Sequence, residues 1–441
     1  MTTEIKAFRE WKNEYQLVGH LVLGQDGTKF RYDEKYICQA DSAPISESLP
    51  FPPFPGKDAF PSDSLYPRAL EQSTFFFKGL LPEEGMKKSF EHKFHSSAID
   101  EDALITRLNN ESVGALIFGN SAADLRKGRF YEPLSEDYFI RFAKNPREVA
   151  LESASQSRLS LAGAQSKVGL YCKVDDLGKR RWFLPIGSAP STVIVKAGSF
   201  IDSLLPNSIF NEAFCMKVAE KCHFETAETK LLEVPEASPL LLIKRFDRLE
   251  GSDFPIRLHQ EDFCQALGYS PAIKYEPNSG NYINQAAYII NRVSDNPFGD
   301  RAAFFQEILF DFLIGNCDNH LKNFSFIWSS DWRSRTLSPL YDVNCTTIYP
   351  FDREMGISLC PSRKIDDVTM EDIKYSAQQA GIPFRIARSL FDELVETIKE
   401  ASNTALEELL AQCTKQETAA DLEKTAEIIM EDMKRRISIH E

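Results

Sequence analysis

The chain has 441 residues, of which 43% are hydrophobic and 26% charged, and its formal net charge is −14. Such a composition is ordinary for a folded protein of two or three domains, and it argues against broad, charge-driven binding of nucleic acid by this chain alone. No apolar run reaches the length of a membrane span, the N-terminus has no apolar signal core, and the nine cysteines lack metal-binding spacing. We therefore expect a cytoplasmic protein with reduced thiols and no membrane contact.

The first 150 residues are predicted to form a small mixed subdomain. Apolar and polar residues alternate on both sides of a Gly-Gln-Asp-Gly turn, which favours an antiparallel sheet. A proline-rich stretch then excludes a helix or a central strand and predicts a loop. We expect strands at residues 15–23 and 29–32 and this loop at 44–67. A helix at 83–110, a strand at 113–118 and a helix at 135–155 follow. Polar Ser and Gln residues accumulate after position 152, so we place a domain boundary near residue 150.

The second segment begins with the sequence Arg-Leu-Ser-Leu-Ala-Gly-Ala-Gln-Ser-Lys at residues 158–167. A glycine between two alanines lets the backbone approach a ligand closely, as a phosphate-binding loop requires. One glycine is weak evidence, because an ordinary β-turn explains it as well. Strands are expected at residues 168–174, 182–184, 192–196, 230–234 and 240–243.

Lys196 ends a run of β-branched residues, Thr192 to Val195. A lysine that faces inward at the end of a strand is costly unless it meets an anion. A helix is expected at residues 209–222, and Glu212 on this helix can reach Lys196. The alternatives are an edge lysine that points to water and an exposed glutamate without a partner. The sequence Lys-Arg-Phe-Asp-Arg at 244–248 is where we expect an interlobe hinge whose backbone binds an adenine ring.

Residues 304–342 contain the pattern with the clearest chemistry. An apolar helix ends at Gly315, a polar loop follows, and two apolar runs can pair as a hairpin. A turn near Trp332 or Arg333 would place Asn323 about opposite Asp342, with Asp318 on the preceding loop. The hairpin therefore predicts one amide oxygen and one carboxylate at its open end.

Oxygen ligands of this kind suit Mg²⁺, which keeps several waters and takes few protein ligands. The carboxylate of Asp318 can orient or deprotonate a hydroxyl. The spacing Asp-x-x-x-x-Asn with a downstream Asp is that of kinase catalytic loops. A polar loop that merely caps a hairpin explains the same residues about equally well.

The rest of the chain is predicted to be mainly helical. His259-Gln-Glu-Asp262 is expected to start a helix, because acidic residues suit the first turn. A further helix is expected at residues 282–293. Residues 366–440 predict three or four amphipathic helices, with breaks at 381–383 and 414–418.

Taken in order, these motifs are the Ser-Leu-Ala-Gly-Ala-Gln-Ser-Lys loop, the Val-Ile-Val-Lys strand, the Asn-Glu helix, the Lys-Arg-Phe-Asp-Arg hinge, the His-Gln-Glu-Asp helix, the Cys-Asp-Asn-His-Leu-Lys-Asn loop and Ser-Pro-Leu-Tyr-Asp. The series resembles the HipA family, the serine/threonine-kinase toxins of bacterial HipBA toxin–antitoxin modules, along nearly the whole chain. The resemblance implies an α+β, two-lobed, protein-kinase-like fold. It divides the chain into an N-terminal β/α subdomain (1–150), a nucleotide-binding part (151–246) and a mainly helical C-terminal lobe with the catalytic loop (247–441).

The resemblance also implies roles for individual residues. Asp318 corresponds to the catalytic aspartate, Asn323 and Asp342 to the Mg²⁺ ligands, and Ser160 to a serine that family members autophosphorylate. Kinases in general pair the phosphate-binding lysine with a helix glutamate, so Glu212 is expected to form a structural ion pair with Lys196. The ATP-binding positions carried over are Ala162, Gly163, Ala164, Gln165, Ser166, Lys167, Lys196, Lys244, Phe246, His320, Lys322, Asn323, Tyr341 and Asp342. Two departures stand out: Asn319 replaces an expected glycine, and residues 197–207 are short for an activation loop.

The function that the resemblance implies is transfer of phosphate from Mg·ATP to an aminoacyl-tRNA synthetase, the glutamate enzyme by analogy. This would halt translation and growth, as in persistence, and autophosphorylation at Ser160 would end it. The expected partner is a HipB-like helix-turn-helix antitoxin, through which alone the chain would reach DNA and co-repress its operon.

Two other functions stay open at this point. A small-molecule kinase of the aminoglycoside-phosphotransferase type fits Asp318, His320 and Asn323 equally well, although the N-terminal domain and the loop with Ser160 argue against it. A non-catalytic co-repressor is the third possibility.

Overall fold

The computed structural model describes residues 3–12, 14–24, 27–51, 74–81, 113–157, 165–175, 177–198, 205–359 and 361–440. The chain divides into two compact units whose segments alternate along the sequence. The first unit comprises Met1–Val195, Arg245–Pro271 and Ile327–Arg335, and the second comprises Lys196–Lys244, Ala272–Phe326 and Thr336–Glu441. The predicted domains 1–150, 151–246 and 247–441 stay a prediction.

A four-stranded antiparallel sheet begins the first unit, with the strand order β3-β2-β1-β4. The two predicted strands are confirmed, and two more strands extend the sheet. A small apolar cluster of Phe8, Tyr15, Ile117 and Leu125 packs together here. The elements are β1 (Thr3–Trp11), β2 (Glu14–Gly24), β3 (Gly27–Tyr32), α1 (Glu34–Ile37), β4 (Ile117–Gly119) and α5 (Ala122–Lys127).

The helix expected at 135–155 is two helices, α6 (Tyr138–Lys144) and α7 (Pro146–Ser157). The break has a local cause, because the residue before a proline is disfavoured in helical geometry and proline itself suits the first helical position. Asn145 accordingly leaves helical geometry, and Pro146 starts α7. Most of the proline-rich loop and the helix expected at 83–110 lie outside the described residues.

A second sheet in the first unit has β5, β7, β6 and β8 as neighbours in that order. The pairs β5–β7 and β6–β7 are antiparallel, as are the short strands β11 and β12. Lys196, the last residue of β8, is also the first residue of the second unit. The elements are β5 (Phe130–Pro133), β6 (Lys167–Val174), β7 (Arg180–Ile186), β8 (Val193–Lys196), β11 (Arg248–Leu249) and β12 (Ile256–Arg257).

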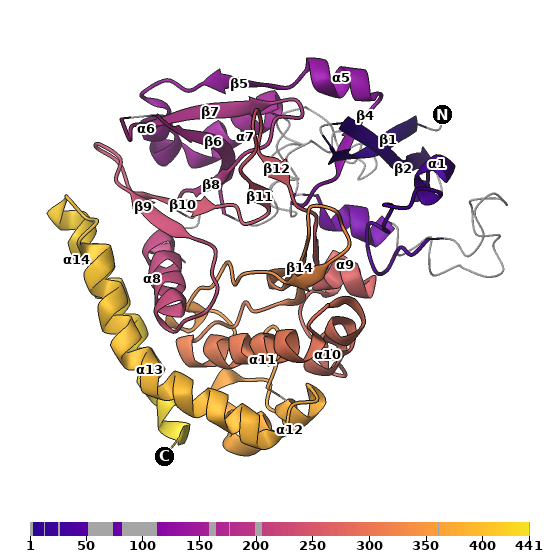
Figure 1. Cartoon of the computed structure of the whole chain (residues 1–441). Helices are drawn as coiled ribbons and strands as arrows, with labels where there is room; N and C mark the ends of the chain where they lie inside the picture. Colours follow the sequence, from indigo (N-terminus) through magenta and orange to yellow (C-terminus); the bar gives the residue numbers. More distant parts are fainter. Residues whose placement is uncertain are drawn as a thin grey trace. The chain divides into compact units, whose positions relative to one another are not determined.

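The second unit is mainly helical (Figure 1). The predicted helices at 209–222 and 282–293 are confirmed, and the C-terminal region forms three helices with breaks at the predicted places. Helix α13 packs against α8, α11, α12 and α14. The elements are α8 (Ser208–Lys221), β9 (Thr229–Leu232), β10 (Leu240–Lys244), α10 (Tyr282–Val293), α11 (Pro297–Ile314), η2 (Leu321–Asn323), η3 (Thr346–Ile348), η4 (Ile365–Asp367), α12 (Met370–Gln379), α13 (Phe384–Leu410), α14 (Gln416–Ile437) and η5 (Ser438–His440).

The prediction that a helix starts at His259 is wrong. Residues Gln260–Asp262 form a buried strand, β13, and the backbone N–H of Trp328 donates to the carbonyl of His259 at 2.9 Å. The helix α9 (Phe263–Leu267) starts only after Asp262, whose side chain accepts from the N–H of Gln265 at 2.8 Å. Asp262 is therefore an N-cap residue rather than part of the first turn.

The predicted hairpin is present as β14 (Ser325–Trp328) and β15 (Arg335–Leu337). The N–H of Ser338 donates to the carbonyl of Ser325 at 2.8 Å, so the turn is centred one residue earlier than predicted. Asn323 lies in the preceding helix η2 rather than on the strand. The hairpin is confirmed, while the predicted register is wrong.

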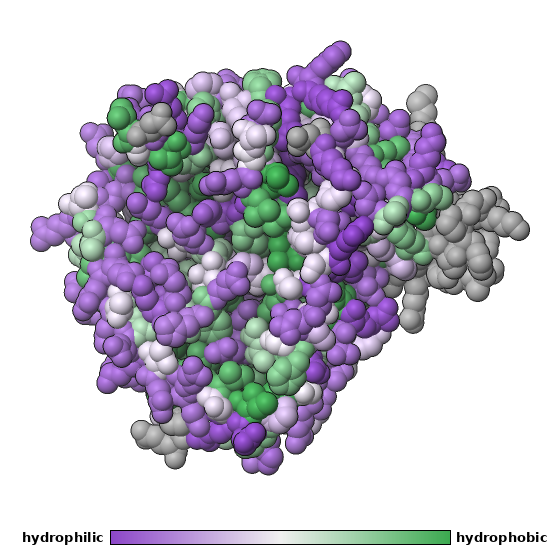
Figure 2. Space-filling view, in the orientation of Figure 1, coloured by the Kyte–Doolittle hydropathy of each residue, from purple (hydrophilic) through white to green (hydrophobic). Residues whose placement is uncertain are grey.

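Hydrophilic residues cover most of the face shown in Figure 2, with apolar residues visible between them. Scattered exposed apolar side chains are normal for folded proteins and need no special explanation. Among the helices of the described residues, none has both the length and the apolar character that a bilayer span requires.

Candidate active site

Lys196 lies at the centre of a buried cluster of charges in the second unit. Its Nζ atom is 2.7 Å from Oε1 of Glu212 and 2.6 Å from Oδ1 of Asp342. Burial by itself lowers the pKa of Lys196, but the Asp342 and Glu212 carboxylates outweigh this effect and hold the pKa above its usual value. The side chain is therefore a permanent cation between two carboxylates.

The sequence of α8 explains why Glu212 faces the interior. This helix carries apolar residues around most of its circumference and is buried on nearly all sides. Its buried polar residues therefore need partners. Glu212 forms an ion pair with Lys196, and the neighbouring Asn211 forms two hydrogen bonds with the backbone of Cys345. The amide of Asn211 donates to the Cys345 carbonyl at 2.9 Å and accepts from its N–H at 2.8 Å. One turn of α8 thus holds both Lys196 and the loop that follows Asp342.

Asp342 has an unusual backbone conformation, with a φ of 60°. This left-handed region is uncommon for residues other than glycine, although aspartate and asparagine tolerate it best. Such strain costs about 1–3 kcal/mol and is typical of functional sites. The Asp342 side chain is 40% exposed although one oxygen is held by Lys196, so a ligand can reach it from solvent.

The loop around Asp318 is closed by hydrogen bonds to its own backbone. Helix α11 ends at Gly315, as predicted, and this residue adopts a φ of 87°. The N–H of Asp318 donates to the side chain of Asn316 at 3.0 Å, and Nδ2 of Asn323 donates to the carbonyl of Asp318 at 2.8 Å. The backbone is fixed on both sides while the Asp318 carboxylate stays 53% exposed.

Two buried asparagines, Asn316 and Asn319, link this loop to neighbouring segments. The Asn316 side chain donates to Oδ1 of Asp311 at 2.8 Å, and burial raises the pKa of Asp311 to about 8. Asn319, which stands where the resemblance predicted glycine, is fully buried. Its amide accepts from the N–H of Ile357 at 3.2 Å and donates to the Ile357 carbonyl at 3.3 Å. The departure at position 319 therefore adds a link between the loop and the segment around Ile357.

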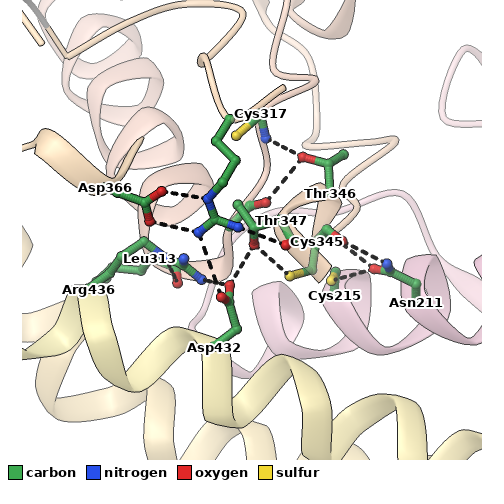
Figure 3. Close-up of polar contacts among 12 residues, drawn as sticks. Asn211, Cys215, Leu313, Cys317, Cys345, Thr346, Thr347, Asp366, Asp432 and Arg436 are labelled. Carbon is green, nitrogen blue, oxygen red and sulfur yellow. Dashed lines mark hydrogen bonds and ion pairs between the residues drawn. The ribbon is translucent and has the colours of Figure 1, made fainter. Parts of the chain in front are cut away.

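Helix α14 fastens the two loops that carry Asp318 and Asp342 (Figure 3). The N–H of Cys317 donates to Oγ1 of Thr346 at 2.7 Å, which joins one loop to the other. The hydroxyl of Thr347 donates to Asp432 on α14 at 2.5 Å. Nε of Arg436, also on α14, donates to the carbonyl of Leu313 at 3.1 Å. Helix α14 thus holds both loops at positions close in sequence to Asp318 and Asp342.

Gly315 allows these loops to approach each other. A Cβ atom at this position would lie 2.3 Å from Oγ1 of Thr347 and 2.7 Å from Nη2 of Arg436. A side chain here would force Thr347 and Arg436 to shift, and the positive φ also favours glycine. The residue is needed for the loop contact as well as for the end of α11.

A tyrosine hydroxyl joins the segments of the two predicted metal ligands. The hydroxyl of Tyr341 donates to the carbonyl of Lys322 at 2.8 Å, and it lies 2.6 Å from Oγ of Ser325. These contacts bracket Asn323 on one segment and adjoin Asp342 on the other. One carboxylate and one amide oxygen form a donor set that suits Mg²⁺.

Comparison with known proteins shows the family of the chain. Residues 159–402 match the HipA-like C-terminal domain, and residues 11–119 match the HipA N-terminal domain. The chain belongs to the HipA family.

Several HipA relatives cover most of this chain. The "Putative kinase Y4mE" of Sinorhizobium fredii is 29% identical over 404 residues, which are 89% of this chain and 90% of the relative. The "Serine/threonine-protein kinase toxin HipA" of Shewanella oneidensis is 27% identical over 353 residues, 75% and 76% of the two chains. A solved chain from the Shewanella oneidensis HipA, HipB and operator DNA complex has a TM-score of 0.76 and 21% identity, and covers 98% of this chain and 97% of its own. This similarity confirms the predicted α+β, HipA-like fold.

Not every residue that the HipA resemblance named is brought together. Lys244 pairs with Glu228 at 3.5 Å on the surface of the second unit, and its N–H donates to the Glu228 carbonyl at 2.9 Å. Lys322 precedes Asn323 in η2. The remaining positions of the first unit are Gln165, Ser166, Lys167 and Phe246, while Ser160, Ala162, Gly163 and Ala164 and most of segment 197–207 lie outside the described residues. The ATP-binding and autophosphorylation roles of all these residues stay predictions.

Two ring side chains lie against Asp318. Nε2 of His320 is 3.9 Å from Oδ1 of Asp318, and burial lowers the pKa of His320 to about 4, so the imidazole is neutral at pH 7. The hydroxyl of Tyr275 donates to the same oxygen of Asp318, and its ring packs edge-on against His320 at 5.1 Å. Tyr275 was not predicted, because it is 43 residues from Asp318 in the chain and no local pattern marks it.

No group of three or more His, Cys, Asp or Glu side chains is arranged to hold a metal within the described ranges. A Mg²⁺ site of the predicted type needs no such group, because this ion keeps several waters. The side chain of Asn323 also has a suitable orientation. Its nitrogen is bonded to the Asp318 carbonyl at 2.8 Å, so its oxygen is the amide atom that remains to accept a ligand.

Proposed function

We propose that this chain is the serine/threonine-protein kinase of a HipBA-type toxin–antitoxin module and that it uses Mg·ATP. The observation that carries the proposal is the contact of the buried Lys196 with both Glu212 and the partly exposed Asp342. A lysine paired with a helix glutamate, beside a metal-binding aspartate, is the arrangement that kinases use to hold nucleotide phosphates. The names of the relatives support the same activity.

The residues of the second unit divide the work of phosphoryl transfer. Lys196 offsets the negative charge of the phosphates, and Asn323 and Asp342 would hold Mg²⁺. The metal, when bound, neutralises the charge that develops on the phosphate oxygens. Asp318 orients the acceptor hydroxyl and takes its proton as the oxygen forms its bond to the γ-phosphorus and ADP leaves. Most of the rate acceleration would come from positioning and charge stabilisation.

The finer parts of the proposal concern the nucleotide and the macromolecules. Residues 162–167, Lys244, Phe246, His320, Lys322 and Tyr341 would complete the ATP site, and Ser160 would be autophosphorylated. The substrate would be an aminoacyl-tRNA synthetase. The partner would be a HipB-like DNA-binding antitoxin, supported by the relative that was solved with HipB and operator DNA. The net charge of −14 suits a basic partner.

Phosphate mapping tests the kinase proposal. The full-length protein is incubated with Mg·ATP alone, with casein and with kanamycin, and phosphate is located by mass spectrometry. Transfer to protein hydroxyls, including Ser160, and its loss in Asp318→Asn and Lys196→Met are expected. Phosphate on kanamycin alone would replace the proposal with a small-molecule kinase.

Growth assays test the toxin proposal separately. Expression of the wild-type chain should arrest growth, and Asp318→Asn should abolish this arrest while HipB binding is retained. Full growth arrest by a folded Asp318→Asn variant would favour the non-catalytic co-repressor.

A further inference from the structure

The hydroxyl of Tyr275 occupies a position that the proposed reaction needs. It donates a hydrogen bond to Oδ1 of Asp318. In the proposed mechanism, the acceptor hydroxyl must donate the same kind of hydrogen bond to the same carboxylate before its proton is transferred. The phenol of Tyr275 therefore occupies the hydrogen-bonding position that an acceptor hydroxyl would take at this stage.

The backbone around Tyr275 is fixed on both sides. The carbonyl of Lys274 accepts from the N–H of Leu321 at 3.1 Å, and the N–H of Glu276 donates to the carbonyl of Gly356 at 2.8 Å. The buried carboxylate of Glu276 also accepts from the N–H and the hydroxyl of Ser358, at 2.8 and 2.7 Å. These contacts hold the segment against the loop of Asp318 and against the segment that Asn319 also binds.

The side chain of Tyr275, in contrast, is 46% exposed. One face contacts His320, and Nζ of Lys274 lies 5.2 Å from the ring centroid. Exposed side chains change rotamer on the picosecond to nanosecond scale. Tyr275 can therefore leave Asp318 by side-chain rotation alone, while its backbone stays in place.

We propose that Tyr275 is a gate on the acceptor side of the site: its hydroxyl caps Asp318 until an incoming acceptor hydroxyl displaces it. This inference rests on the proposed kinase function. The gate suppresses transfer to water and selects acceptors that bind well enough to compete with the phenol. It acts on the acceptor and leaves the binding of Mg·ATP unchanged.

Tyr275→Phe tests the gate, because it removes the hydroxyl and keeps the ring against His320. Formation of ADP is measured for the full chain with Mg·ATP, first without an acceptor and then over a range of casein concentrations. Removing one hydrogen bond of modest net strength should raise ADP formation without acceptor, and lower the KM for casein, by roughly threefold to tenfold. The KM for Mg·ATP should not change.

Tyr375→Phe is the matched control, since Tyr375 is 43% exposed on α12 of the same unit. It should behave as the wild type. Unchanged or slower turnover in Tyr275→Phe would overturn the gate, and so would phosphate on Tyr275 itself, which would make this residue an acceptor. If Asp318→Asn still abolishes turnover in that case, the kinase proposal stands without the gate. If the wild type and every variant fail to consume ATP, both proposals fail.

Discussion

The two units each contain a buried cluster of cations and carboxylates, and the clusters differ in one respect. In the first unit, Asp247 is held by Arg245 and Arg248, each with a nitrogen 2.7 Å from Oδ2, and by the N–H of Gly114 at 3.0 Å. Burial raises the pKa of Asp247, but the two arginines outweigh it and hold the pKa below its usual value. Only 4% of the Asp247 side chain is exposed.

In the second unit, the corresponding cluster is open. Lys196 and Glu212 are buried, but Asp342 keeps 40% of its side chain exposed and carries backbone strain. In a closed cluster the charges interact only with one another and with the fold, because every carboxylate oxygen already has a partner. An open cluster can still bind a ligand. The comparison teaches that exposure of one member, rather than burial of the pair, distinguishes a candidate active site from a structural ion pair.

The largest effect is expected when the closed cluster is broken. Asp247→Ala leaves two buried arginines without their carboxylate, so the free energy of unfolding should fall by about 3–5 kcal/mol. Urea denaturation measures this change. Asp253→Ala, at an exposed position of the same unit, is the control and should change little. An unaltered urea midpoint for Asp247→Ala would show that the cluster does not stabilise the fold.

The second prediction concerns the open cluster. Asp342→Asn removes the charge but keeps a residue that tolerates the positive φ. The rate of phosphoryl transfer should fall about 10²- to 10³-fold, while the free energy of unfolding changes by less than about 1 kcal/mol. Steady-state kinetics and denaturation check the two halves. Asp352→Asn, at an exposed position in the same unit, should keep both values. A large loss of stability with intact catalysis would reverse the comparison.

Glu261 sharpens the comparison, because it is fully buried in the first unit and forms no ion pair among the described residues. Burial raises the pKa of Glu261 from 4.5 to about 7, although Ser46 and Arg335 act in the opposite direction. Since the folded state holds this proton more tightly, its contribution is complete below pH 4.5 and is lost as pH rises through 7.

Glu261→Gln mimics the protonated form and should remove this pH dependence. The wild type should lose stability relative to the variant between pH 5 and 8, by on the order of 3 kcal/mol. Urea midpoints at the two pH values measure the difference. Glu250→Gln, at an exposed position, serves as the control. Parallel pH profiles for the wild type and Glu261→Gln would contradict the assignment.

The smallest effect is expected at Asn211, which links α8 to the loop after Asp342. Asn211→Ala removes both hydrogen bonds to Cys345 and should cost about 1–3 kcal/mol of stability. The looser loop should also lower turnover severalfold more than it raises the KM for Mg·ATP. Asn403→Ala on the exposed face of α13 is the control. Full turnover in Asn211→Ala would show that the open cluster needs no support from this side chain.

Local patterns were sufficient for much of the fold. The helix at residues 282–293 and the stop at Gly315 depend on neighbours in the chain, and both were predicted correctly. The strand β13 was missed, because its acidic residues resemble the first turn of a helix and only its partner strand decides otherwise.

The hairpin register was missed for a similar reason. Trp332 adopts a φ of 64°, which is rare for a bulky residue, and its ring stacks on His259 at 4.6 Å and lies 4.9 Å from the guanidinium of Arg9. These distant partners act together with the local turn residues Ser329 and Asp331, whose side chains accept from the N–H groups of Ser334 and Arg333. The contact of Tyr275 with Asp318 is equally non-local.

The left-handed conformation of Asp342 also bears on how this family can diverge. A single nucleotide change gives asparagine or glycine at this position, and both residues are comfortable at a φ of 60°. The loop would keep its shape and its links to α8 and α14, and only the carboxylate would disappear. Under the proposed role of Asp342 as a metal ligand, a descendant that keeps the fold and has lost most of its phosphoryl transfer is therefore one mutational step away.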